Sequence, residues 1–95
     1  MTEKELQQKF DNFAWNVYAL RRNAHMTQQE LAEIMGTSSS VISHLESKKR
    51  MDVLGSTALL VSDAFGVTVD EMYNTRVQLE YPLDRLMGRR PWRER

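Results

Sequence analysis

Two short helical patterns lie close together in the stretch TQQELAEIMGTSSSVISHLE, residues 27–46. The first has a clear start, because Thr27 and Glu30 have the spacing of a capping box, and a clear end at Gly36, which tolerates the left-handed cap conformation. The second begins within Thr37 to Ser39, whose hydroxyls can cap a helix. Two helices joined by about three residues and crossing at a wide angle restrict the residues at their crossing more than any other feature of the chain.

The crossing requires a small residue in the first helix, a residue tolerant of positive φ in the turn, and apolar residues in the second helix. Ala32, Gly36, Ile42 and Leu45 meet these requirements. When Gln28 is counted as position one, they occupy positions five, nine, fifteen and eighteen. This is the spacing of the helix-turn-helix motif, whose second helix enters the major groove of DNA. A helical hairpin that binds nothing is the alternative.

Helical spacing also predicts which faces of the two helices are buried. The inward residues are expected to be Leu31, Ile34, Met35, Val41, Ile42 and Leu45. On the second helix, the opposite stripe holds no large apolar side chain; it consists of Ser40, Ser43, His44 and Ser47. That stripe is therefore expected to face something polar.

The rest of the chain predicts three further helices and a short strand. A first helix from about Thr2 to Asn23 has an apolar face made of Leu6, Phe10, Phe13, Val17 and Leu20. A fourth helix, closed by Gly66, is indicated by the spacing of Leu54, Ala58, Val61, Ser62 and Phe65. A second capping box, Thr68 with Glu71, starts a short fifth helix. Alternation over Val77–Tyr81 predicts a strand that ends at Pro82, followed by a loosely ordered arginine-rich tail.

The stretch MTQQELAEIMGTSSSVISHLE resembles the Cro/C1-type helix-turn-helix domain of phage repressors and bacterial regulators. The resemblance continues into STALLVSDAFGVTVDEMY and covers roughly residues 13–73. It implies an all-α, five-helix, lambda-repressor-like domain over residues 13–75. Residues 1–12 are then an extension of the first helix, and residues 76–95 a strand-like or disordered tail that is a candidate dimerisation segment.

The resemblance also implies roles for individual residues. Base contacts are expected from Ser39, Ser40, Ser43 and His44. Phosphate contacts are expected from Arg21, Gln28, Thr37, Ser47, Lys48 and Lys49. Arg21 and Glu46 match a pair that joins the first helix to the end of the recognition helix.

Two departures from the family pattern concern the recognition helix. Lys48 stands where the family usually has a glycine after this helix. The predicted base-reading stripe has no Arg, Asn or Gln, so the usual bidentate contacts with guanine or adenine are missing. Serines discriminate weakly between bases, and His44 is either a donor to a guanine acceptor or an inert surface residue.

Charge and composition restrict the other classes of function. The net charge is zero, which argues mildly against a nucleic-acid binder, although Lys48, Lys49 and Arg50 form a basic run. With no cysteine, and with His25 and His44 nineteen positions apart, neither a metal site nor a cofactor is expected. No residue arrangement supports an enzyme. No apolar run approaches the ~20 residues that span a bilayer, so a cytoplasmic protein without a membrane partner is expected.

The favoured function is a DNA-binding transcription regulator, a repressor that binds operator half-sites as a homodimer through the helix that starts near Ser38. Its dimer contacts are expected from Val69, Met72, Tyr73, Leu79 and Tyr81. One alternative is an antitoxin that binds a toxin and represses its own operon. The other is a protein-interaction module that no longer binds DNA.

Overall fold

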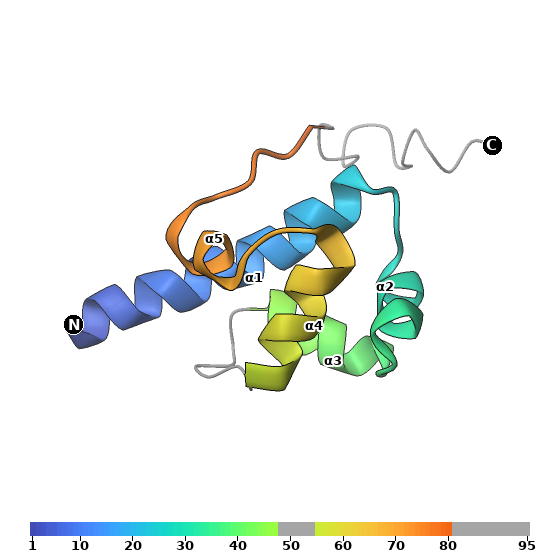
Figure 1. Ribbon diagram of the computed structural model, residues 1–95, viewed down its shortest axis with the longest axis horizontal. Helices are drawn as coiled ribbons and strands as arrows, with labels where there is room; N and C mark the ends of the chain where they lie inside the picture. Colours follow the sequence, from blue (N-terminus) through green and yellow to red (C-terminus); the bar gives the residue numbers. More distant parts are fainter. Residues whose placement is uncertain (48–54, 81–95) are drawn as a thin grey trace.

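Five α-helices make up the part of the chain that the computed structural model describes, residues 1–47 and 55–80 (Figure 1). They are α1 (Glu3–Asn23), α2 (Gln28–Met35), α3 (Ser39–Glu46), α4 (Gly55–Phe65) and α5 (Val69–Asn74). The all-α, five-helix fold predicted from the sequence is confirmed. The long α1 packs against both α3 and α5.

The N-terminal turns of α1 extend past the other helices, at the blue end of Figure 1. The sequence stabilises this exposed end locally. Thr2 Oγ1 accepts a hydrogen bond from Glu5 N, and a Glu5 carboxylate oxygen accepts one from Thr2 N, which completes a capping box. Hydrogen bonds from the backbone and then the side chain of Thr2 lower the pKa of Glu5. Burial on the predicted apolar face becomes complete only at Phe13, whereas Leu6 is 42% exposed.

The short helices α2 and α3 begin and end where the sequence predicts. Thr27 and Glu30 form the expected capping box, and Gly36 has a left-handed φ of 71°. The prediction that a hydroxyl caps the start of α3 is wrong. The N-cap residue is Ser38, but its hydroxyl makes no capping bond. It lies 3.4 Å from the hydroxyl of Ser40 instead.

The hydrophobic core lies where all five helices meet. Its fully buried large side chains are Phe13, Val17, Leu31, Ile42, Val61 and Met72. Leu31, Met35, Ile42 and Leu45 are buried as predicted. Ile34 is not; its side chain is 58% exposed, so the prediction that it faces the core is wrong. The core contacts of α2 run through Leu31, Ala32 and Met35, and position 34 lies beyond the edge of that face.

The predicted strand is also wrong within the described residues. Residues 75–80, here named the C-terminal segment, are not in a helix or strand, and they run beside α1 toward its C-terminal end (Figure 1). Their backbone groups pair with side chains of α1 and not with a second strand. Asn16 Oδ1 accepts from Val77 N at 2.8 Å, and Asn23 Oδ1 accepts from Glu80 N at 2.8 Å. Tyr81, the end of the predicted strand, lies outside the described residues.

The carbonyl groups of this region are paired in the same way. Asn16 Nδ2 donates to the carbonyl oxygens of Met72 and Thr75, each at 2.8 Å. Trp15 Nε1 donates to Val77 O at 2.7 Å. Asn23 Nδ2 donates to Gln78 O at 2.9 Å. The side chains of α1 therefore hold the C-terminal segment through its backbone.

Candidate nucleic-acid interface

A bidentate ion pair joins the C-terminal half of α1 to the end of α3. Arg21 Nε donates to Glu46 Oε2 at 2.7 Å, and Arg21 Nη2 donates to Glu46 Oε1 at 3.0 Å. Both side chains are nearly buried, at 7% and 8% exposure. Arg21 Nη1 also donates to Met26 O at 2.9 Å. The pair expected for Arg21 and Glu46 is present, and it fixes the orientation of α3 relative to α1.

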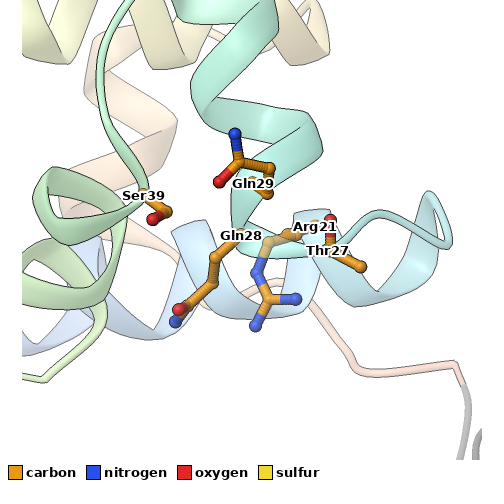
Figure 2. A pocket seen from close by; sticks show the side chains of 5 residues that line it. All are labelled: Arg21, Thr27, Gln28, Gln29 and Ser39. Atoms are coloured by element: carbon orange, nitrogen blue, oxygen red, sulfur yellow. The ribbon is translucent and has the colours of Figure 1, made fainter.

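An open pocket of about 450 Å³ lies beside this ion pair, at the start of α2. Its lining comes from three helices and consists of Arg21, Thr27, Gln28, Gln29 and Ser39. Figure 2 shows the side chains of Gln28 and Arg21 next to each other, with Ser39 facing them from the neighbouring helix. Gln28 Nε2 donates to Glu46 Oε1 at 3.1 Å, so the amide belongs to the same hydrogen-bonded group as the ion pair.

The chemistry of the pocket is suited to an anion. It combines the guanidinium of Arg21, side-chain amides and hydroxyls with the N-terminal end of α2, where backbone N–H groups and the helix dipole attract negative charge. Glu46 contributes the opposing negative charge, but both of its oxygens already accept bonds from Arg21. Such a set of donors matches a phosphate of a nucleic-acid backbone.

The outer face of α3 is polar and accessible, as its sequence predicts. Ser40, Ser43, His44 and Ser47 are exposed, and Ser39 is half-buried at the edge of the pocket. Ser47 Oγ donates to His44 O at 2.9 Å and so closes the end of the helix. Hydroxyl and imidazole groups therefore cover the surface that a groove of DNA would meet.

The remaining predicted phosphate contacts are less closely grouped. Thr37 is half-buried in the turn between α2 and α3, and its backbone N–H donates to Ala32 O at 2.9 Å. Lys48 and Lys49 lie outside the described residues. The structure therefore brings together Arg21, Gln28 and Ser39, and it adds Thr27 and Gln29, which the sequence analysis did not select. The sequence could have indicated Gln29, because it follows Gln28, an expected phosphate contact, at the start of the capped helix α2.

The predicted dimer residues fall into different environments. Met72 is 1% exposed and lies in the core of its own chain, so it offers almost no surface to a second copy. Tyr73 packs its ring on Phe13 at a centroid distance of 5.0 Å. Val69 and Leu79 are half-buried, and Tyr81 lies outside the described residues. The most exposed large apolar side chains after Met1 are instead Leu59 at 64% and Ile34 at 58%.

Residues 1–47 and 55–80 contain neither a membrane-spanning helix nor a cluster of metal ligands. No helix there is long and apolar enough to cross a bilayer. No three His, Asp or Glu side chains in the same residues are grouped so that they could hold a metal ion.

Comparisons with known proteins agree with this geometry. A family model described as Helix-turn-helix matches residues 17–72, which include α2, α3 and most of the helices that support them. The comparisons with curated proteins and with solved structures found no match.

Proposed function

The chain belongs to the Cro/C1-type helix-turn-helix family of DNA-binding transcription regulators, and we propose that it is a repressor that binds operator half-sites with α3 in the major groove. A domain of this size carries out regulation most simply by occupying a promoter. The proposed site of action is the compartment that holds the DNA, the cytoplasm.

The observation that carries this proposal is the position of the anion-binding pocket next to the polar face of α3. Ser39 belongs to both, because it lines the pocket and stands at the first turn of α3. A phosphate bound between Arg21 and Gln28 would therefore set the depth and angle at which Ser40 and His44 meet base edges. Phosphate contacts position a protein on DNA, and base contacts give it specificity.

The composition of the polar face of α3 predicts how affinity is divided between phosphate contacts and base contacts. Single hydroxyls form weaker and less selective base contacts than bidentate Arg or Asn side chains. Most of the affinity is therefore expected from phosphates, and specificity is expected from the symmetric use of two half-sites about one helical turn apart. This makes a homodimer on DNA part of the proposal. Val69, Tyr73 and Leu79 are the predicted contact residues that keep some exposed surface.

The salt dependence of binding tests the phosphate contribution. Affinity for a duplex should fall steeply with salt, and changing Lys48 and Lys49 together to Ala should reduce the slope of log K against log salt by about 1–2. Fluorescence anisotropy of a labelled duplex over a salt series measures that slope. An unchanged slope would show that the basic run does not contact DNA. Absence of binding by the wild-type chain at any salt would reject the proposed function.

His44 tests base reading by α3. His44→Ala should reduce the preference for the selected base at one position by about 1–3 kcal/mol. It should leave binding to random duplex unchanged. The preferred sequence is obtained by selection from a randomised pool with the wild-type chain, and the variant is then measured on single-base substitutions of it. Ser56→Ala, an exposed change at the start of α4, is a matched control. Equal losses on preferred and random DNA would contradict base reading by His44.

A further inference from the structure

Tyr18 lies on α1 one turn before Arg21, and two guanidinium groups lie over its ring. The Cζ atom of Arg21 is 5.5 Å from the centre of the Tyr18 ring, and the Cζ atom of Arg22 is 5.4 Å from it. The Tyr18 hydroxyl accepts a hydrogen bond from Arg22 Nη1 at 2.9 Å. Both distances to the ring are within the range of a cation–π contact, which is about 6 Å.

We propose that Tyr18 is a positioning residue for Arg21 when that arginine contacts a DNA phosphate, an inference that rests on the proposed function. Glu46 and the carbonyl of Met26 accept hydrogen bonds from the guanidinium, and its Cζ atom lies over the Tyr18 ring. A guanidinium has five N–H donors, and three of them make the bonds described above. The other two are the donors left for the phosphate, and the contacts of the guanidinium with Glu46, Met26 and Tyr18 restrict their direction.

Trp15 gives the Tyr18 ring its own support. The two rings pack at a centroid distance of 5.7 Å with planes inclined by 51°. Trp15 is in turn anchored to the C-terminal segment by its bond from Nε1 to Val77 O at 2.7 Å. The Tyr18 ring therefore contacts both arginines and also Trp15, which is bonded to the C-terminal segment. This explains why Trp15 and Tyr18 lie off the apolar face of α1 that packs into the core.

The test combines Tyr18→Leu, which removes the ring, with Tyr18→Phe, which keeps the ring and removes only the hydroxyl. Each is measured alone and together with Arg21→Ala, on the duplex that the wild-type chain enriches from a randomised pool. Loss of a cation–π contact should make Tyr18→Leu bind about threefold more weakly. In the Arg21→Ala background the same change should have no effect, because Tyr18 acts through Arg21. Tyr18→Phe should bind like wild type.

A second measurement needs no DNA. The Arg21 Nε–H signal in a ¹⁵N correlation spectrum should carry a ring-current shift that is lost in Tyr18→Leu and kept in Tyr18→Phe. Far-ultraviolet circular dichroism verifies folding, and Tyr18→Met, with a flexible side chain that fills space without a ring, replaces a leucine variant that does not fold.

Two results would overturn the role of Tyr18 and leave the proposed function standing. One is an unchanged Arg21 signal in Tyr18→Leu. The other is an equal loss of affinity on Tyr18→Leu with and without the Arg21 side chain. The second result would show a general effect on the fold. If the wild-type chain enriches no duplex, the proposed function fails and this inference fails with it.

Discussion

The helix α1 holds two other parts of the molecule, and it does so in two different ways. Its C-terminal half binds the helix-turn-helix pair, α2 and α3, through buried apolar side chains and the bidentate pair of Arg21 with Glu46. The same half of α1 binds the C-terminal segment through Asn16, Asn23 and Trp15, whose side chains pair with backbone groups. The first attachment depends on the side chains of both partners, whereas in the second the side chains of α1 bond mainly to backbone groups. Arg76 adds one side-chain bond, from its Nε to Asn12 Oδ1 at 2.9 Å.

This difference predicts which substitutions are tolerated. A backbone carbonyl or N–H is present whatever the side chain, so most residues of the C-terminal segment can change without loss of the bonds that hold it. The asparagines of α1 cannot change in the same way, because each places a donor and an acceptor next to an extended chain. In the helix-turn-helix attachment, by contrast, a change on either side breaks the pair.

The largest effect is expected from breaking the charged attachment. Glu46→Gln keeps the size of the side chain but leaves the nearly buried guanidinium of Arg21 without its counter-charge, so the free energy of unfolding should fall by about 3 kcal/mol. Urea unfolding monitored by circular dichroism measures this. Glu33→Gln, an exposed change on α2, is the matched control. A loss below about 1 kcal/mol would mean that the pair behaves as an ordinary surface salt bridge.

A smaller effect is expected from the backbone attachment. Asn16→Ala removes the partner of Val77 N and of the carbonyls of Met72 and Thr75, and should lower the free energy of unfolding by about 2 kcal/mol.

Gln78→Ala is the control for that change, because Gln78 contributes its backbone carbonyl to Asn23. It should alter the free energy of unfolding by less than about 0.5 kcal/mol. If Gln78→Ala were as harmful as Asn16→Ala, the claim that this attachment depends mainly on the side chains of α1 would be refuted.

The smallest effect concerns the end of α1 that lies outside both attachments. The Thr2 backbone and side chain lower the pKa of Glu5 below its ordinary 4.5 in the folded chain. The stabilisation from this carboxylate is therefore present above the unfolded pKa and is lost as the pH falls through the lower, folded pKa. A carboxyl titration by NMR should show a low pKa for Glu5 in the wild-type chain and a higher one in Thr2→Ala. No difference between the two would exclude the Thr2 side chain as a cause and leave the backbone N–H of residue 2 as the source of the lowered pKa.

The same comparison explains how far the sequence predicts the fold. The helix-turn-helix pair was predicted because its signals are local: Thr27 and Glu30 are three residues apart, and Gly36 ends the helix they start. The C-terminal segment has a real alternation, since Val77 and Leu79 are half-buried while Gln78 and Glu80 are exposed. That alternation predicts a strand, because sequence periodicity does not show whether a neighbouring strand or a helix side chain pairs with the backbone.

The candidate site divides in a similar way. The family resemblance implies the pairing of Arg21 with Glu46, and helical spacing predicts the polar, accessible face of α3. The contact of Tyr18 with Arg21 did not, because one turn of spacing on α1 is also compatible with two solvent-exposed side chains. The exposure of Ile34 was missed for a related reason: helical spacing gives an approximate face, and only the packed partners define its edge.

The sequence distance between partners has a consequence for the order in which the chain assembles. Arg21 and Glu46 are 25 residues apart, whereas Asn16 and Val77 are 61 residues apart. Closing the longer loop costs about 0.8 kcal/mol more in chain entropy, and contacts between near neighbours form faster than contacts between distant ones. We therefore expect the helix-turn-helix pair to dock on α1 first and residues 75–80 to join last. Until they arrive, Trp15 and Asn16 face water, so hydrogen exchange at Val77 and Glu80 should report the last step of folding and the first step of unfolding.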